Sequence, residues 1–372
     1  MGDKRCNLQA IKLPISEYMN HSQHWANSVL GVQYYADNVV NINADQNIPV
    51  SSVPMKRLDD GDSICDVWFT DANGANFPTS GQYQQIKYRY NDDLIFGVIE
   101  LSEVLFQSNS DKTPLQQATE SAYDQIFCLL ELQSFPYLFR VRNYMADING
   151  DSFGLERYLQ FNLGRQDAFL SHKRDVEGNV PAACALGFGA VTSDEASSQN
   201  SLMIAFLAGR VVPQSIENPR QISAYKYPEQ YGPRSPTFSR ASLVKLGDDD
   251  ILFLSGTASI VGHQTLHHGD VIAQTNETIE NIKAVITQVN RQFNEPKFDL
   301  STLHYTVYIR HSKDLDLVRN ELKRRVGDTV NAVYLQADVC RQDLLVEIEA
   351  TAGHSTAAFS SDANTLMNDH LN

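Results

Sequence analysis

Apolar positions after residue 215 recur first with the period of a strand and then with the period of a helix. In the helical stretches they return every three or four residues, as Ile279, Ile282 and Ile286 do. The predicted elements, in chain order, are a strand at 251–254, a helix from Thr275 as N-cap to Gln288, a strand at 304–309, a helix capped by Ser312, and strands at 332–337 and 344–350. This order predicts an α+β fold in which helices pack on one face of a mixed β-sheet.

The same order of elements recurs upstream. The corresponding predictions are a strand at 94–99, a helix opened by Thr113 and Pro114, a strand at 137–144, a helix within 154–170, and strands at 180–190 and 202–208. Because the match is in element order and not in residue identity, we predict a degenerate internal duplication. The predicted domains are an N-terminal unit at 1–215 whose first 84 residues add edge strands, a C-terminal unit at 216–356, and a mobile polar tail at 357–372.

Composition narrows the class of protein. A formal charge of −15 and a pI near 5.0 argue against a protein that coats nucleic acid or anionic lipid, so we predict neither as a partner. The five cysteines are scattered and form no Cys-x-x-Cys pair, and no apolar run approaches the roughly 18–20 residues of a membrane span. No signal peptide stands at the start of the sequence. We therefore predict a cytoplasmic protein with free thiols.

Two segments carry arginine in settings that suit an anionic ligand. The connection at 220–239 is dense in Tyr, Pro and Arg, and its prolines reduce the freedom of the side chains between them. Arginine binds a carboxylate through a planar fork, and tyrosine adds a neutral donor. Arg165, which follows a glycine near a predicted helix, is a second candidate. The alternative for the connection is a rigid linker whose charges are solvated, and the alternative for Arg165 is an ordinary surface residue.

A third segment, at 255–263, places Ser and Gly directly after a strand, where a ligand can approach the backbone closely. It lacks the Gly-Lys-Ser/Thr of a phosphate loop. The nearby His263, His267 and His268 have no carboxylate or thiolate at metal-ligand spacing. We predict ordinary loop histidines and no metal site.

The last predicted strand carries two carboxylates on one face. Glu347 and Glu349 alternate with the apolar Val346, Ile348 and Ala350. Such a face is most often solvated or paired with cations. If it instead meets the other unit, a carboxyl on it loses water, its pKa rises, and it becomes a competent proton donor.

Four segments in this order resemble the chorismatase family, whose members are built on a RidA-like (YjgF-type) fold. They are RYLQFNLGRQDAF (157–169), YPEQYGPRSPTFSRA (227–241), LFLSGTASIVGH (252–263) and ADVCRQDLLVEIEA (337–350). The resemblance covers roughly residues 80–355 and implies two RidA-like units.

The resemblance also implies an activity, namely the cofactor-free cleavage of chorismate with release of pyruvate. Chorismate carries two carboxylates, and the resemblance implies that Arg165, Tyr227 and Arg240 bind them, with Arg310 and Ala258 as further substrate contacts. Glu347 matches the family's catalytic glutamate, which protonates the methylene carbon of the enolpyruvyl group. Cys340 resembles the cysteine of members that form 3-hydroxybenzoate, so we predict that product.

Several alternatives stay open. Related enzymes release 4-hydroxybenzoate, or hydrolyse chorismate to a dihydroxycyclohexadiene carboxylate. A RidA-like imine deaminase is disfavoured because its carboxylate-binding arginine would fall near Ala332. A non-catalytic protein that binds a small carboxylate is the remaining alternative. RidA proteins are trimers with sites between subunits, so the resemblance allows a homotrimer or an internal imitation of part of one.

Overall fold

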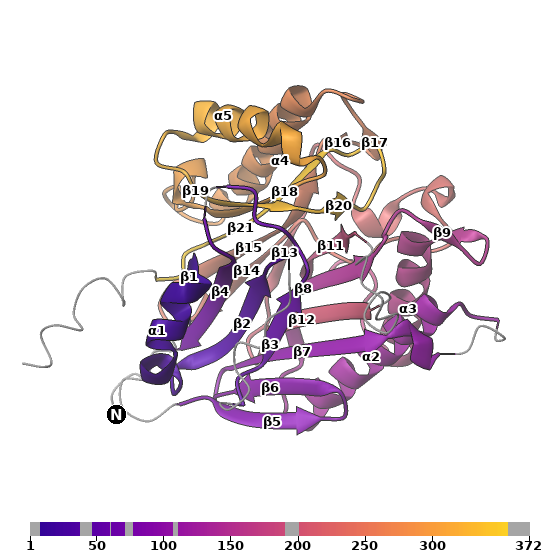
Figure 1. Cartoon of the computed structure of the whole chain (residues 1–372), viewed down its shortest axis with the longest axis vertical. Coiled ribbons are helices and arrows are strands. Elements are labelled where there is room, and N and C mark those ends of the chain that lie inside the picture. Colours follow the sequence, from indigo (N-terminus) through magenta and orange to yellow (C-terminus); the bar gives the residue numbers. More distant parts are fainter. Residues whose placement is uncertain are drawn as a thin grey trace, which may run out of the picture.

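The computed structural model describes residues 8–37, 47–59, 61–70, 77–106, 111–189 and 201–355. The tail predicted at 357–372 lies outside these residues. The three largest sheets have seven, six and four strands, and Figure 1 shows the helices on the outside with the sheets facing inward. No helix of the described part is long and apolar enough to cross a membrane.

The second unit has the architecture that the sequence predicts. Its elements are β13 (Gln214–Ile216), β14 (Ala241–Leu246), β15 (Asp249–Ala258), α4 (Val271–Asn290), β18 (His304–Ile309), α5 (Leu315–Val326), β19 (Asn331–Gln336) and β21 (Val346–Ala352). The strands run in the order β13-β14-β15-β21-β18-β19, and β18 pairs with β19 in parallel. Both helices pack on one face of this sheet through a common apolar core.

The first unit repeats that plan. Its elements are β5 (Thr79–Tyr83), β6 (Ile86–Tyr90), β7 (Leu94–Ser102), α2 (Pro114–Leu132), β8 (Tyr137–Ala146), α3 (Arg157–Ser171), β11 (Ala182–Phe188) and β12 (Ser201–Gly209). The order β5-β6-β7-β12-β8-β11 matches the second unit strand for strand, including the parallel pair, here β8 and β11. The internal duplication is therefore confirmed, and each unit is RidA-like.

Short elements complete the two units and lie beside the connections. They are β9 (Asp151–Ser152), β10 (Leu155–Glu156), β16 (Ile260–Val261), β17 (Gln264–Thr265) and β20 (Asp338–Val339). Of these, β20 crosses from the second unit to pair with β11, which extends the first sheet to seven strands. This crossing brings the turn after β20 against the first unit.

The N-terminal region differs from the prediction. We expected its residues to add edge strands to the first unit, and of the described strands before residue 84 only β5 does so. The others form a separate sheet in the order β1-β4-β2-β3, built from β1 (Leu8–Pro14), β2 (Val29–Tyr35), β3 (Val50–Val53) and β4 (Ile64–Thr70), with α1 (Ile15–Trp25) beside it.

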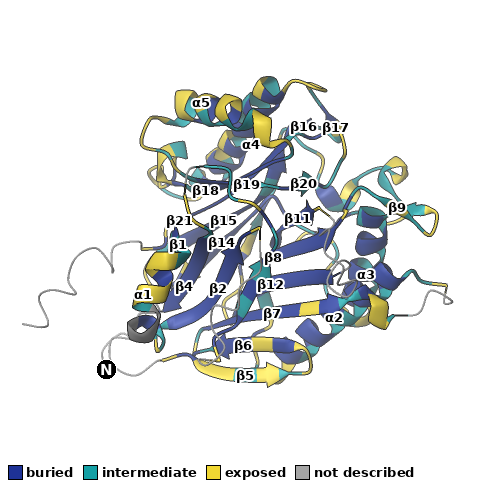
Figure 2. Ribbon diagram, in the orientation of Figure 1, coloured by how far each residue is buried: buried dark blue, intermediate teal, exposed yellow. Residues whose placement is uncertain are grey.

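The three sheets meet in a shared core on their inner faces. Trp68 from the N-terminal sheet, Phe139 from the first unit and Phe253 from the second belong to one buried apolar cluster. Figure 2 shows the inner strands buried and the outer faces of the helices exposed. The inner face of each unit is thus removed from water. Polar side chains on this face therefore need hydrogen-bond or charge partners within the protein.

Two helix starts differ from the predicted ones. Helix α4 begins one turn early because Asp270 caps it, accepting from the Ala273 amide at 3.0 Å, while the Thr275 hydroxyl donates back to the Val271 carbonyl. Ser312 opens a short 3₁₀ turn, Ser312–Asp314, that precedes α5. The predicted cap of α2 is confirmed, since Thr113 Oγ1 accepts from the Gln116 amide at 3.2 Å.

Candidate active site

A cavity of about 420 Å³ lies where the first and second units meet. The first unit supplies β11 and the start of α3, and the second supplies β15, β21 and the turn at 340–343. The connection at 221–240 supplies the remaining wall. Six of the predicted site residues line this cavity: Glu347, Cys340, Arg165, Tyr227, Arg240 and Ala258.

Glu347 enters the cavity because of the two-residue period of β21. Val346 and Ile348 turn toward the helices of the second unit, so Glu347 turns toward the first unit. Its side chain is buried, and burial raises the pKa of Glu347 from 4.5 to about 8; the negative charge of Glu349 adds to this and Arg240 opposes it. The carboxyl is therefore mostly protonated near neutral pH, as a proton donor must be.

Gly256 leaves the space that the Glu347 carboxyl occupies. A Cβ at this position would lie 2.0 Å from Glu347 Oε1 and 3.1 Å from Cys184 Cβ. The pairing of β15 with β21 shifts by one residue between Leu254 and Thr257, which is a β-bulge beside the cavity. A side chain at position 256 would displace the carboxyl.

Ser255 fixes this bulge to the rest of the cavity wall. Its hydroxyl donates to the Ser239 carbonyl at 2.6 Å and accepts from the Ala183 amide at 2.9 Å. The bulge, the connection and β11 of the first unit are thereby held together. Ala258, at the end of β15, lies opposite Glu347 in the strand register.

Glu349 has the opposite environment two residues further along the same strand. Arg140 Nη2 lies 2.6 Å from one of its oxygens and Arg142 Nη2 lies 2.9 Å from the other, to which the Tyr308 hydroxyl also donates. Burial alone would raise its pKa, but the two guanidinium groups hold the pKa of Glu349 at about 2. Glu349 is ionised and does not line the cavity.

Arg165 and Arg240 bring positive charge to the cavity. Arg165 is 2% exposed, and its Nη2 donates to Asn162 Oδ1 at 2.8 Å. Arg240 Nη2 donates to the Ile222 carbonyl and to the Tyr227 hydroxyl, at 3.0 and 2.9 Å. In the part of the chain that the structure describes, neither guanidinium forms an ion pair, and the Nε of each is buried without a hydrogen-bond partner.

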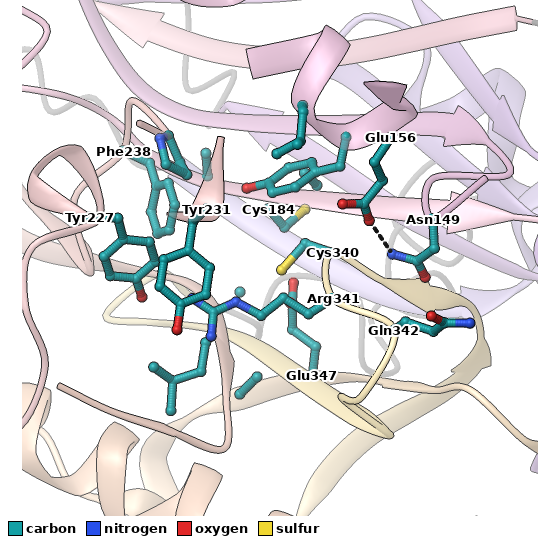
Figure 3. Close-up of a pocket in the computed structure, with 18 of the residues that line it drawn as sticks. Asn149, Glu156, Cys184, Tyr227, Tyr231, Phe238, Cys340, Arg341, Gln342 and Glu347 are labelled. Carbon is teal, nitrogen blue, oxygen red and sulfur yellow. Dashed lines mark hydrogen bonds between the residues drawn. The ribbon is translucent and has the colours of Figure 1, made fainter. Parts of the chain in front are cut away.

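The connection at 221–240 contributes aromatic rings. Tyr227 and Tyr231 lie 5.5 Å apart between ring centroids, and the Tyr231 hydroxyl is 3.1 Å from His263 Nδ1. Figure 3 shows both rings on the side of the cavity opposite Glu156. His267 and His268 do not line the cavity; each lies 3.3 Å from a carboxylate, that of Glu277 and that of Asp343 respectively.

Cys340 lies in the turn between β20 and β21, next to Glu347 in the cavity (Figure 3). Burial, and then the Glu347 carboxyl, raises the pKa of the Cys340 thiol to about 12, so it is not a thiolate. Cys184, on β11, reaches the cavity from the first unit.

Arg310 is the one predicted site residue that does not line the cavity. Its guanidinium is occupied by the carbonyls of Leu344, Val339 and Arg341 and by the Asp338 carboxylate, 2.6 Å away. These acceptors lie in β20 and in the turn that follows it, so Arg310 holds the segment that carries Cys340. The predicted contact of Arg310 with a ligand is therefore not part of the site that we assign below.

The cavity also contains side chains that sequence reasoning did not single out, among them Arg341, Glu156 and Cys184. Arg341 directly follows Cys340 and Glu156 directly precedes the 157–169 motif, so adjacency to these motifs was the available signal. Burial raises the pKa of Glu156, whose Oε1 accepts from Asn149 Nδ2 at 3.3 Å. Cys184 carried no local signal.

Comparisons with known proteins agree with this geometry. A family model described as "Chorismatase FkbO/Hyg5-like, N-terminal" matches residues 66–208. The 3-hydroxybenzoate synthase of Streptomyces hygroscopicus is 33% identical over 87% of this chain and 91% of its own length, and a chorismatase of Streptomyces rapamycinicus is 33% identical over 87% and 92%. A chorismatase crystal structure, 28% identical, covers 94% of this chain and 100% of its own with a TM-score of 0.80. The chain belongs to the chorismatase family.

Proposed function

We propose that this protein is a chorismatase that converts chorismate into 3-hydroxybenzoate and pyruvate without a cofactor. The observation that carries the proposal is a buried, protonated carboxyl, Glu347, in a cavity that also contains unpaired guanidinium groups. Such a cavity suits a dianionic substrate that must receive a proton on a poorly basic atom. The names of the relatives, chorismatase and 3-hydroxybenzoate synthase, support this choice of substrate and product.

In the proposed reaction, Arg165 and Arg240 bind the two carboxylates of chorismate, and the Tyr227 hydroxyl adds a hydrogen bond. Ala258, opposite Glu347 on β15, borders the enolpyruvyl group. Glu347 then donates its proton to the methylene carbon of that group, so positive charge develops on the adjacent ether carbon and oxygen. Removal of water from the cavity favours this step because the neutral acid is the stable form there.

Pyruvate leaves when the bond between the ring and the ether oxygen breaks. The neighbouring ring hydroxyl displaces it, so no water is added and the two products together hold all the atoms of chorismate. The proton lost on formation of the aromatic phenol replaces the one that Glu347 donated. Glu347 is thereby returned to its starting state without an external reagent.

Cys340 is the proposed determinant of the product. In Cys340→Ala we expect the ratio of 3-hydroxybenzoate to other aromatic or diene products to fall severalfold, while pyruvate release slows less, because the thiol borders the ring and does not donate the first proton. Chromatography of the products measures this ratio. Cys128→Ala, in α2 and outside the cavity, is the matched control. An unchanged ratio in Cys340→Ala would remove Cys340 from product selection.

We propose that the absence of a side chain at Gly256 is needed to accommodate the Glu347 carboxyl. In Gly256→Ala we expect kcat to fall about a hundredfold, because displacement of a catalytic group by about 1 Å has effects of this order. Gly189→Ala, whose added Cβ would meet nothing within 4 Å, is the control for the substitution itself. Unfolding temperatures of both variants separate rate from stability. A Gly256→Ala enzyme with the wild-type kcat would contradict the assigned position of the carboxyl.

The direct test of the function is to incubate the purified protein with chorismate and resolve the products by chromatography. We expect pyruvate and 3-hydroxybenzoate in equal amounts. Absence of pyruvate would reject the enzyme, and pyruvate with a dihydroxycyclohexadiene carboxylate would reject the product but keep the family's reaction. Turnover of imine substrates instead would favour a deaminase.

The proposal uses only residues of one polypeptide. It therefore does not depend on a homotrimer, which the RidA resemblance allows. We infer a cytoplasmic enzyme, and the free thiols of Cys65, Cys128, Cys184 and Cys340 support a reducing compartment.

A further inference from the structure

The cavity holds a third arginine, Arg341, beside the two already assigned. Its guanidinium lies over the Tyr231 ring, 4.1 Å from the centroid, and 5.3 Å from the centroid of Tyr227. Nη1 donates to the His263 carbonyl at 2.9 Å and to Thr265 Oγ1 at 3.2 Å. Nη2 is buried and has no hydrogen-bond partner. Arg341 is thus held firmly while one of its donors is unused.

Arg240 faces the same aromatic ring. Its guanidinium carbon lies 5.7 Å from the Tyr227 centroid, and its Nη2 donates to the Tyr227 hydroxyl. Two positive charges are therefore gathered around one tyrosine. Within the described ranges no carboxylate forms an ion pair with either, although the charges of Glu217 and Glu156 act on Arg240 and Arg341 respectively. Arg240 is buried and Arg341 is partly buried; like charges in such surroundings repel, and buried charges in proteins are normally paired. An anion placed between them would satisfy both.

We propose that Arg341 and Arg240 together bind the carboxylate of the enolpyruvyl arm, which leaves Arg165 for the ring carboxylate. This inference rests on the proposed function and adds the orientation of the substrate to it. Arg240, Arg341 and Glu347 line the same cavity, so an arm held at this pair would present its methylene to the proton donor. Arg165 reaches the cavity from α3 of the first unit, where it stacks on Phe161 at 4.9 Å.

Figure 3 shows the Arg341 side chain running from beside Cys340 and Glu347 toward Tyr231. Arginine binds a carboxylate through two parallel hydrogen bonds, and Lys cannot reproduce this geometry. The competing explanation is that Arg341 only holds the connection at 221–240 in place. The two explanations differ in which ligands they affect, because 3-hydroxybenzoate carries the ring carboxylate and lacks the enolpyruvyl arm.

The experiment measures dissociation constants by calorimetry in a Glu347→Gln background, so that chorismate is not consumed. We expect the added Arg341→Met substitution to weaken chorismate binding about 10- to 100-fold, the range for loss of a charge-assisted pair of hydrogen bonds. Arg341→Lys should weaken chorismate binding less than Arg341→Met does. The affinity for 3-hydroxybenzoate should change by less than about twofold in both, whereas Arg165→Lys should weaken both ligands.

Arg210 offers a matched control outside the cavity. Its guanidinium also lies 4.1 Å from a ring centroid, that of Phe135, and also donates to backbone carbonyls. Arg210→Met should leave both affinities unchanged. Unfolding temperatures identify any variant that fails to fold, in which case Arg341→Lys decides the question.

The possible outcomes separate the inference from the function on which it rests. If the Glu347→Gln parent binds chorismate and the Arg341 variants bind it equally well, the inference is wrong and the proposed function stands. Equal losses for chorismate and 3-hydroxybenzoate would also overturn it, because they would indicate a general effect on the cavity. If the parent binds no chorismate and the wild-type enzyme does not consume it, both are overturned.

Discussion

Replacement of Glu347 by glutamine is expected to lower kcat for pyruvate release by about 10²- to 10⁴-fold, the contribution of a well-placed general acid. Glutamine keeps the size and the neutral charge of the protonated side chain, and it cannot donate a proton to carbon. The substitution should therefore leave the dissociation constant of chorismate within severalfold of the wild-type value. Initial rates of pyruvate formation and a calorimetric titration with chorismate measure the two quantities.

A large fall in kcat with a nearly unchanged dissociation constant distinguishes a catalytic role of Glu347 from a structural one. A glutamate that only supported the fold would lose binding and rate together when replaced, and would lower the unfolding temperature. Full activity in Glu347→Gln would remove Glu347 from the mechanism. Loss of binding with unchanged kcat would make it a substrate-binding group.

Replacement of Glu349 by glutamine is expected to lower the free energy of unfolding by about 3–5 kcal/mol, because breaking a buried ion pair leaves an uncompensated charge. Arg140 loses its carboxylate, while Arg142 keeps Asp66 at 2.7 Å. Urea denaturation followed by circular dichroism measures the change. Glu100→Gln, an exposed glutamate on β7, is the control and should stay within about 0.5 kcal/mol.

The pH dependence of unfolding checks the same assignment. The pKa of Glu349 is about 2 in the folded protein and near 4.5 when unfolded, so its contribution is present above pH 4.5 and is lost as the pH falls toward 2. The wild type should lose more stability than Glu349→Gln over that range. Equal losses, or an unfolding free energy in the variant equal to that of the wild type at pH 7, would contradict a stabilising role for this cluster.

The two glutamates differ because of their partners and not because of their burial. Both are almost fully buried on the same face of β21, where the second unit meets the first. Two arginines from β8 neutralise Glu349, while Glu347 faces a cavity in which the cations are not paired with it. A strand pattern can predict that both face the other unit, but only the tertiary structure decides which one is ionised.

The repeated units could be predicted because their strands and helices have clear periods. The strand at 304–309 alternates, with Tyr305, Val307 and Ile309 on one face, and β18 has the predicted bounds. Strands of the N-terminal sheet lack this signal. All seven residues of β2, and all seven of β4, are buried, so neither strand alternates and no two-residue period marks a solvent face.

Sequence reasoning named candidate site residues from their own motifs, and six of these residues line one cavity. It could not place residues whose surroundings depend on distant segments. Arg310 was assigned to the ligand because it ends a strand near the site, but the loop at 338–345 takes up its donors. Arg341 was overlooked because its position depends on Tyr231, in a connection far away in the sequence. No local spacing records such a contact.

The pH dependence of kcat most directly tests the central claim, that burial makes Glu347 the proton donor. With a pKa raised to about 8, the carboxyl is protonated at pH 6–7 and loses its proton as the pH rises. We predict a plateau of kcat for pyruvate release at pH 6–7 and a fall of about tenfold per pH unit well above pH 8. A kcat that rises from pH 7 to pH 9 would mean that the essential group acts in its ionised form, and would contradict this account.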